Sequence, residues 1–284
     1  MRYGFATPFA SSQEKLDLDF YKAVKEAGYD FLELPGTLIN NISEEDFDRL
    51  TDFLGETGIQ SEGLCSLFPG RIKFFSVGDS ELEEYIDWIF EKAGALGVKT
   101  IGFGSGGCRR LPEGMDAAEG MDIFAGKVRE HILPYLTKYD YNMVIEPFNP
   151  AETNFILTAA DGAEAIRRIG SGRIGLLEDT LHMIGSEEDP VRVMKEQGGM
   201  VRHIHISEPG REMPVTQYSE KCLACVKTFA ASGYDGTLSF ETKCADFRDL
   251  AVALETLKAN WMRQDLPCQM RSCIWKPLRK SLVN

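Results

Sequence analysis

The 284-residue chain is short of basic residues and contains no long apolar run. Its 31 Lys and Arg against 44 Asp and Glu give a net charge of −13, which opposes binding to the phosphates of nucleic acids. No apolar run approaches the roughly 18 residues of a transmembrane helix. The N-terminal residues, Met1 to Ala6, lack the continuous apolar segment of a signal peptide. We therefore expect a cytoplasmic protein without a membrane or nucleic-acid partner.

The seven cysteines are odd in number and scattered, which favours reduced thiols over a disulfide framework. Cys222 and Cys225 are the one close pair, and they lie in a helical pattern with no second such pair. A structural role is therefore a simpler interpretation of this pair than zinc or redox chemistry. A chain of this length buries about three quarters of its unfolded surface, so its core needs no disulfides.

Eight short apolar segments alternate with eight helical patterns, which predicts a parallel sheet. Eight such units in a chain of this length favour a closed barrel over an open sheet. We expect one α/β domain, a single (β/α)₈ TIM barrel over residues 1–263, and a C-terminal extension over 264–284. The strands are predicted at 3–6, 31–34, 59–64, 99–103, 143–146, 174–179, 201–205 and 238–241, and the helices at 17–27, 43–58, 79–97, 116–138, 159–169, 189–197, 218–231 and 247–261.

A glycine-rich segment, Gly102 to Gly107, follows the fourth predicted strand. A dinucleotide-binding fingerprint would instead follow the first strand and open a helix. We therefore expect these glycines to serve backbone geometry. Arg109 and Arg110 stand beside the segment and could bind a substrate phosphate; a solvated pair of loop arginines is the alternative.

Four consecutive apolar segments each end on a side chain that can bind a metal. The intervals between these ends are 33, 26 and 36 residues, close to the roughly 30 residues of a βαβ unit. Because barrel sites lie at the carboxyl ends of strands, the four side chains should converge. Three carboxylates and one imidazole suit one divalent ion such as Mn²⁺, Mg²⁺ or Co²⁺ better than a structural zinc. The predicted ligands are Glu146, Asp179, His205 and Glu241.

The alternation of side chains along a strand predicts where the residues next to the expected ligands lie. His203 shares a face with His205, so we expect it inside the barrel, behind the ligands. Glu178 lies on the opposite face from Asp179 and is expected to be structural. Glu33 ends the second strand at the same rim, and we expect it to contact substrate.

Four motifs surround the predicted ligands: Glu146-Pro-Phe-Asn149, Asp179-Thr-Leu-His182, His203-Ile-His205 with Arg211, and Gly233-Tyr-Asp-Gly236 before Ser239-Phe-Glu241. In these motifs the chain resembles the xylose isomerase-like TIM barrels, and more narrowly the sugar phosphate isomerase/epimerase family of D-tagatose 3-epimerase and the psicose epimerases. The resemblance implies one divalent metal, commonly manganese, on Glu146, Asp179, His205 and Glu241. It further implies that His182 and Arg211 bind substrate oxygens, and that Glu146 and Glu241 move protons on opposite faces of the sugar.

The expected activity is that of a divalent-metal-dependent isomerase or epimerase. Its substrate would be a sugar, a sugar phosphate or a related polyol. Removal of a proton from the carbon next to a carbonyl would give an enediolate that the metal stabilises. The alternatives are an inosose dehydratase-like lyase, an endonuclease IV-like phosphodiesterase and a non-catalytic sugar-binding barrel. The nuclease branch holds three metals with many histidines, whereas this acidic chain has four histidines in all. The substrate is expected to be a small molecule, and a homo-oligomer is possible.

Two segments depart from the family pattern. Glu212-Met-Pro-Val-Thr stands where ketose epimerases usually carry a longer Pro-Gly-x-Gly stretch, and Thr242 replaces the usual proline after Glu241. Both segments border the expected substrate, so the identity of the sugar stays open.

Overall fold

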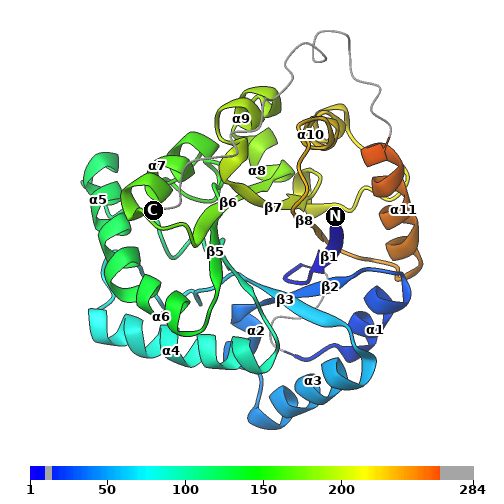
Figure 1. The fold of residues 1–284 in the computed structure, drawn as a ribbon, viewed down its shortest axis with the longest axis horizontal. Helices are drawn as coiled ribbons and strands as arrows, with labels where there is room; N and C mark the ends of the chain where they lie inside the picture. The colour runs from blue at the N-terminus through cyan, green and yellow to red at the C-terminus, as the bar shows by residue number, and fades with distance from the viewer. Residues whose placement is uncertain (10–14, 263–284) are drawn as a thin grey trace.

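The eight predicted strands form a closed parallel barrel in chain order, which confirms the expected TIM barrel (Figure 1). The computed structural model describes residues 1–9 and 15–262, so the expected C-terminal extension, 264–284, lies outside the described residues. The last strand pairs with the first and closes the sheet. The strands are β1 (Arg2–Ala6), β2 (Phe31–Pro35), β3 (Gln60–Cys65), β4 (Thr100–Phe103), β5 (Asn142–Ile145), β6 (Ile174–Asp179), β7 (Val201–Ile206) and β8 (Thr237–Glu241).

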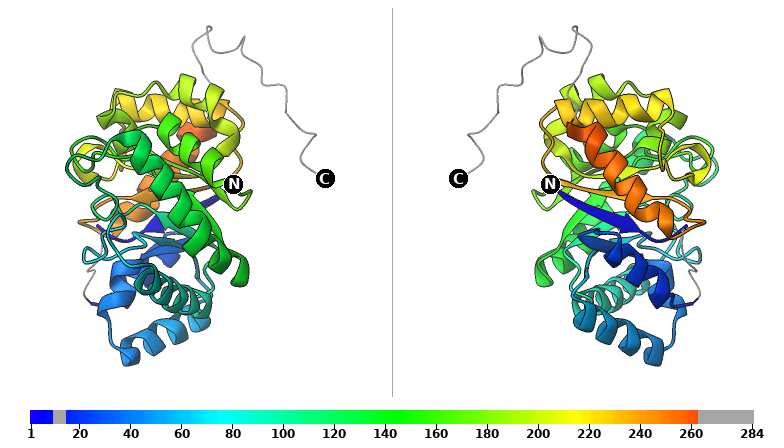
Figure 2. Two further views of the ribbon diagram at one scale, coloured as in Figure 1. Left: turned by 90° about the vertical axis from the view of Figure 1, so that its left-hand side faces the viewer. Right: turned by 90° about the vertical axis from the view of Figure 1, so that its right-hand side faces the viewer.

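A ring of helices surrounds the barrel, as the side views in Figure 2 show. Their ends carry the expected signals: the Ser43 hydroxyl caps α3, and Gly58 ends that helix in the left-handed conformation. The helices are α1 (Leu18–Glu26), α2 (Gly36–Asn41), α3 (Glu44–Thr57), α4 (Asp79–Ala95), α5 (Ala117–Lys127), α6 (Leu133–Lys138), α7 (Ala159–Ile169), α8 (Thr180–Gly185), α9 (Pro190–Glu196), α10 (Glu220–Ala231) and α11 (Arg248–Met262).

Three helical features differ from the sequence prediction. The expected helix over 116–138 is interrupted by a π-helical turn, Val128–Ile132, between α5 and α6. Pro134 explains the interruption, because its ring cannot accommodate the carbonyl one turn before it. Helices α2 and α8 were not predicted, and each directly follows a strand. At six residues each, they are too short to show a helical period.

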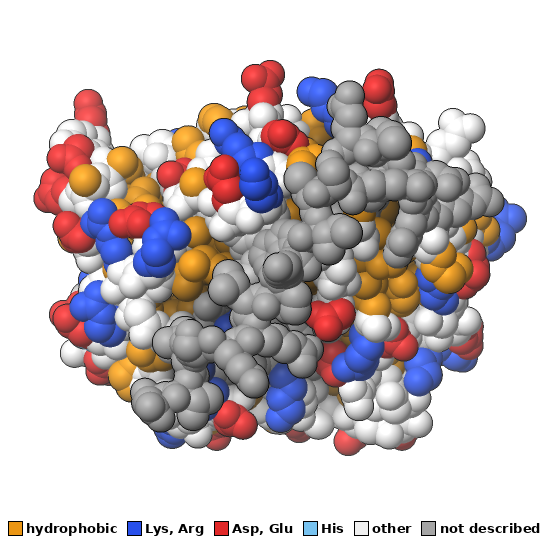
Figure 3. Space-filling model, turned by 45° about the horizontal axis from the view of Figure 1, so that its top comes forward, with side chains coloured by type: hydrophobic (Ala, Val, Ile, Leu, Met, Phe, Trp, Pro, Cys, Tyr) orange, Lys and Arg blue, Asp and Glu red, His pale blue; other side chains and the backbone are white. Residues whose placement is uncertain are grey.

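Most of the core lies between the barrel wall and the helices. Buried aromatic rings from β4, α5 and the loops pack together there; Phe74, for example, contacts Phe103 edge to face and Phe124 at a tilt, both at centroid distances of 5.3 Å. The outer surface carries acidic and basic side chains side by side, as the face in Figure 3 shows. Within residues 1–9 and 15–262, no helix is long and apolar enough to cross a membrane.

Candidate metal and substrate site

The four predicted metal ligands converge at the carboxyl end of the barrel. Glu146, Asp179, His205 and Glu241 each offer a ligand atom, and these atoms lie within 4.8 Å of one another. Strand register explains the convergence: Asp179 pairs with His205 across β6 and β7, Glu241 ends β8, and Glu146 directly follows β5. All four side chains are buried.

Two atoms at the centre of this group lack partners. Glu146 Oε1 and His205 Nδ1 are buried and have no hydrogen bond within the described part of the chain. They lie 3.9 Å apart, and Glu241 Oε2 is 3.5 Å from the same Nδ1. Because buried polar atoms normally have a partner, two unpartnered atoms that face each other in this group fit a bound cation. The oxygen-rich donor set suits a divalent ion.

Asp179 has a second structural task. It is the N-cap of α8, and its Oδ1 accepts a hydrogen bond of 2.8 Å from the Leu181 backbone N–H. This leaves Oδ2 facing the site, where Arg211 contacts it. The cap therefore fixes one oxygen and directs the other toward the cation position.

Arg211 and His182, the two predicted substrate-binding residues, lie together beside the ligands. The Arg211 guanidinium donates to Asp179 and Glu241, and its Nη2 is 3.0 Å from His182 Nε2. Arg211 has a positive φ of 61°, an unfavourable conformation for a residue with a side chain. The His182 ring packs at a tilt against the Phe148 ring, with a centroid distance of 4.1 Å, and its Nδ1 accepts a hydrogen bond from the Asn149 backbone N–H.

The two glutamates predicted to move protons have opposite pKa shifts. Burial, with repulsion from Glu241, raises the pKa of Glu146 well above its usual value. Burial opposes ionisation of Glu241 too, but the charges of Arg211 and His205 lower the pKa of Glu241 to about 2. In the metal-free protein, one carboxyl is thus favoured in the protonated form and the other as the anion. For His182, burial and the nearby Arg211 lower the pKa, so its imidazole is neutral.

The glycine-rich segment serves backbone geometry, as predicted. A Cβ at Gly104 would lie 2.1 Å from Glu146 Oε2, and one at Gly106 would lie 3.1 Å from the Phe148 ring. The missing side chains therefore make room for Glu146 and for the aromatic ring behind His182.

Neither alternative considered for Arg109 describes its position. Its side chain is completely buried, so it is neither solvated nor free to bind a phosphate. It donates to the backbone carbonyl oxygens of Phe103, at 2.8 Å, and of Glu146. Arg109 thus joins the ends of β4 and β5. Its neighbour Arg110 is exposed and donates to the Glu152 carbonyl.

Glu33 was expected to contact substrate, but its two carboxylate oxygens face imidazoles inside the barrel. Oε1 is 2.8 Å from His203 Nε2, and Oε2 is 3.3 Å from His205 Nε2. His203 lies behind the ligands, where the strand alternation places it. Glu178 is buried on the other side of the wall, beside Cys225.

Two residues near the site were missed by the sequence reasoning. Cys65 ends β3 and is buried; its pKa is raised well above the usual value by burial and by the charges of Glu241, Glu33 and Glu146. Its position at the carboxyl end of a strand is the signal that could have identified it, because barrel sites lie at these ends. Glu152 is partly exposed, 3.8 Å from His182, and no strand signal precedes it.

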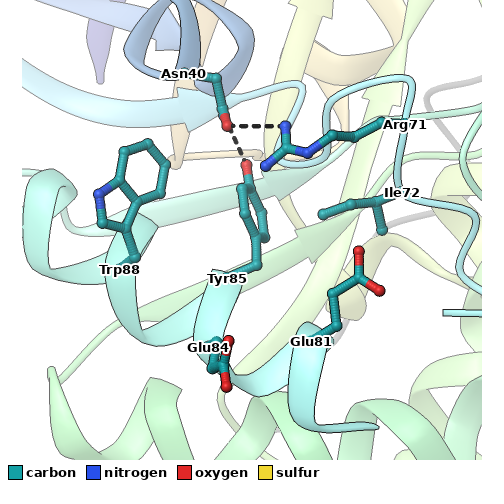
Figure 4. A pocket seen from close by; sticks show the side chains of 7 residues that line it. All are labelled: Asn40, Arg71, Ile72, Glu81, Glu84, Tyr85 and Trp88. Carbon is teal, nitrogen blue, oxygen red and sulfur yellow. Dashed lines mark hydrogen bonds between the residues drawn. The ribbon is translucent and has the colours of Figure 1, made fainter. Parts of the chain in front are cut away.

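A separate cleft of about 490 Å³ lies outside the barrel, between α2, α4 and the loop after β3. Three of its polar side chains bond to one another: Asn40 donates to the Tyr85 hydroxyl and accepts from Arg71 (Figure 4). Arg71 also lies over the Tyr85 ring. The unpartnered buried atoms of Glu146 and His205 lie at the strand ends, outside this cleft.

Comparison with known proteins agrees with this geometry. The sequence model of the family described as xylose isomerase-like TIM barrel matches residues 21–265. D-psicose 3-epimerase of Agrobacterium fabrum is 22% identical over 205 residues, covering 69% of this chain and 68% of that protein. The 3-dehydro-D-guloside 4-epimerase of Escherichia coli is 24% identical over 207 residues, covering 69% of this chain and 76% of that protein.

Solved structures share the fold. A structure of L-ribulose 3-epimerase superposes with a TM-score of 0.77 at 20% identity, covering 97% of this chain and 99% of the other. D-psicose 3-epimerase from Clostridium cellulolyticum superposes with a TM-score of 0.77 at 18% identity, covering 92% and 99% of the two chains.

Proposed function

Because the chain belongs to the xylose isomerase-like TIM barrel family, we propose that it is a divalent-metal-dependent isomerase or epimerase. The substrate class is a sugar, a sugar phosphate or a related polyol. The observation that carries the proposal is the convergence of Glu146, Asp179, His205 and Glu241 on one group of ligand atoms that a single cation could bridge. Two curated relatives are sugar epimerases by name, which supports this class of reaction.

The metal would be held by Glu146, Asp179, His205 and Glu241, and the two unpartnered atoms among them support this assignment. Mn²⁺ is our first choice, with Mg²⁺ and Co²⁺ as alternatives, because the donors are mostly oxygen. When bound, such an ion acts as a Lewis acid and stabilises negative charge developing on substrate oxygens.

Glu146 and Glu241 are the proposed proton-transfer groups. Inverting a carbon next to a carbonyl needs a base on one face of the substrate and an acid on the other. Two carboxyls whose environments separate their proton affinities suit these roles. One of the two glutamates takes a proton from the substrate carbon, and the other returns one on the opposite face. The reverse reaction exchanges the roles.

His182 and Arg211 are proposed to bind the substrate's oxygens. Arg211 is already paired with two ligand carboxylates, so its guanidinium is held in place before substrate arrives. Because its Nδ1 accepts from the Asn149 backbone, neutral His182 carries its proton on Nε2 and can donate it to a substrate oxygen. The buried setting strengthens both contacts.

The proposal is tested by incubating the protein and Mn²⁺ with a panel of ketoses, sugar phosphates and inososes in deuterated water. We expect NMR to show solvent deuterium at one retained carbon of a converted sugar. Loss of water from the product would instead indicate a lyase. Glu146→Gln and Glu241→Gln should each lower turnover by about 10²–10⁴-fold, because each removes a positioned proton-transfer group.

Glu178→Gln is the matched control, since Glu178 is a buried glutamate outside the site. It should turn over substrate at the wild-type rate. Absence of Mn²⁺ binding to the wild-type protein, together with no conversion of any sugar in the panel, would overturn the proposal.

A further inference from the structure

A column of hydrogen-bonded side chains runs inside the barrel beneath the metal ligands. Thr237 Oγ1 lies 2.7 Å from His203 Nδ1, and His203 Nε2 lies 2.8 Å from Glu33 Oε1. Glu33 Oε2 lies 3.3 Å from His205 Nε2. The four residues come from β2, β7 and β8, and a cavity of about 90 Å³ borders the lower three of them.

The barrel wall is adapted to Glu33. The register between β2 and β3 shifts between Leu32 and Glu33, so that Glu33 lies opposite Gly63. A Cβ at Gly63 would lie 2.5 Å from Glu33 Cγ. A bulge and a glycine together therefore place a carboxylate inside the barrel, where a buried charge is costly without partners.

The chemistry of the imidazole explains what this carboxylate does. An imidazole that binds a metal is in its neutral form, with one N–H and one lone pair. When His205 donates its Nε2–H to Glu33, the lone pair is on Nδ1, the atom that faces Glu146 and Glu241. A carboxylate behind a metal-binding histidine fixes both the ring orientation and the tautomer in this way.

We infer that Glu33, held by His203, is a positioning residue that orients His205 toward the metal side of the site. This inference rests on the proposed metal-dependent function. It assigns Glu33 to the metal rather than to the sugar, because both its oxygens are occupied by imidazole nitrogens. His203 supports Glu33 from below and is itself anchored by Thr237.

The test measures Mn²⁺ affinity by calorimetry, without substrate, in the wild type, Glu33→Ala and Glu33→Gln. The alanine variant loses the acceptor for His205, so we expect its Kd for Mn²⁺ to rise by about 10–100-fold. The glutamine variant keeps an oxygen that can accept from His205, while its amide can donate to the other tautomer of His203. We therefore expect Glu33→Gln to restore most of the lost affinity.

Glu178→Gln is the control for removing a buried carboxylate, and its Kd should equal that of the wild type. Melting temperatures in EDTA verify that each variant is folded. An unchanged Kd in folded Glu33→Ala overturns the inference, and equal losses in the alanine and glutamine variants overturn the orienting role. A raised KM for the sugar with unchanged Mn²⁺ affinity would overturn the inference and show that Glu33 contacts the substrate instead. If the wild type itself binds no Mn²⁺, the proposed function fails instead.

Discussion

Replacement of Glu178 by glutamine should make the protein's stability less sensitive to rising pH. The Glu178 side chain is 1% exposed on the outer side of the barrel wall, and its Oε1 has no hydrogen-bond partner in residues 1–9 and 15–262. Burial raises the pKa of Glu178 well above its usual value, and the neighbouring charges of Glu188 and Asp179 raise it further. The folded protein therefore holds this carboxyl in the neutral form.

The sign follows from proton linkage. Below about pH 4.3, the pKa of an unfolded glutamate, Glu178 is protonated in both the folded and the unfolded protein, so its ionisation does not lower the free energy of unfolding. Above that pH the unfolded carboxyl ionises while the folded one does not, so the free energy of unfolding falls as pH rises. The loss is up to about 1.4 kcal/mol per pH unit and ends at the folded pKa. Glu178→Gln cannot ionise and escapes this loss.

Urea unfolding of both proteins at pH 5, 6, 7 and 8, in EDTA to keep the site metal-free, measures the difference. We expect the advantage of Glu178→Gln over the wild type to grow by as much as about 2.7 kcal/mol from pH 5 to 7. Equal m-values would show that only stability has changed. A difference that does not vary with pH would refute the reasoning, because it would mean that Glu178 ionises in the folded state as in water.

Gly104→Ala should abolish Mn²⁺ binding and turnover without unfolding the barrel, because its Cβ would lie 2.1 Å from Glu146 Oε2; Gly107→Ala is the control, with nothing within 4 Å of the new carbon. Calorimetry that finds equal affinities in these two variants would contradict this. A hundredfold excess of Mn²⁺ over its Kd should stabilise the wild type by about 2.7 kcal/mol in thermal melts, and Asp179→Asn, which keeps the α8 cap, should lose this gain. Thr158→Ala removes the capping box of α7 and should cost about 1 kcal/mol in urea unfolding; an unchanged midpoint would count against the cap.

The barrel and the four converging side chains were predictable because both follow from periodicity. Strand and helix patterns repeat at nearly constant intervals, and parallel strands bring their carboxyl ends to one rim. A side chain such as Asp179 or Glu241 can therefore be placed from its position at the end of an apolar run. The structure brings these residues together, while their roles in binding metal and moving protons stay predictions.

What could not be predicted depends on contacts between distant segments. The two carboxylate oxygens of Glu33 face imidazoles because the register between β2 and β3 shifts at Glu33. No pattern within one strand predicts such a shift. Arg109 looks like a loop arginine in sequence, yet it is buried because two carbonyl oxygens at strand ends point at it. In both cases a partner comes from another segment of the chain, so reasoning about one segment alone cannot find it.

The pairing of β8 with β1 has a consequence for how the protein acquires its site. Ala6 pairs with Glu241, so the first strand of the chain fixes the last proposed ligand. During synthesis, a nascent chain that has emerged only as far as β7 carries three of the four ligands but cannot close the wall. Tight binding of a divalent cation would thus occur only once the barrel has closed. Added metal should therefore protect the closed barrel from proteolysis and should not protect earlier, open forms.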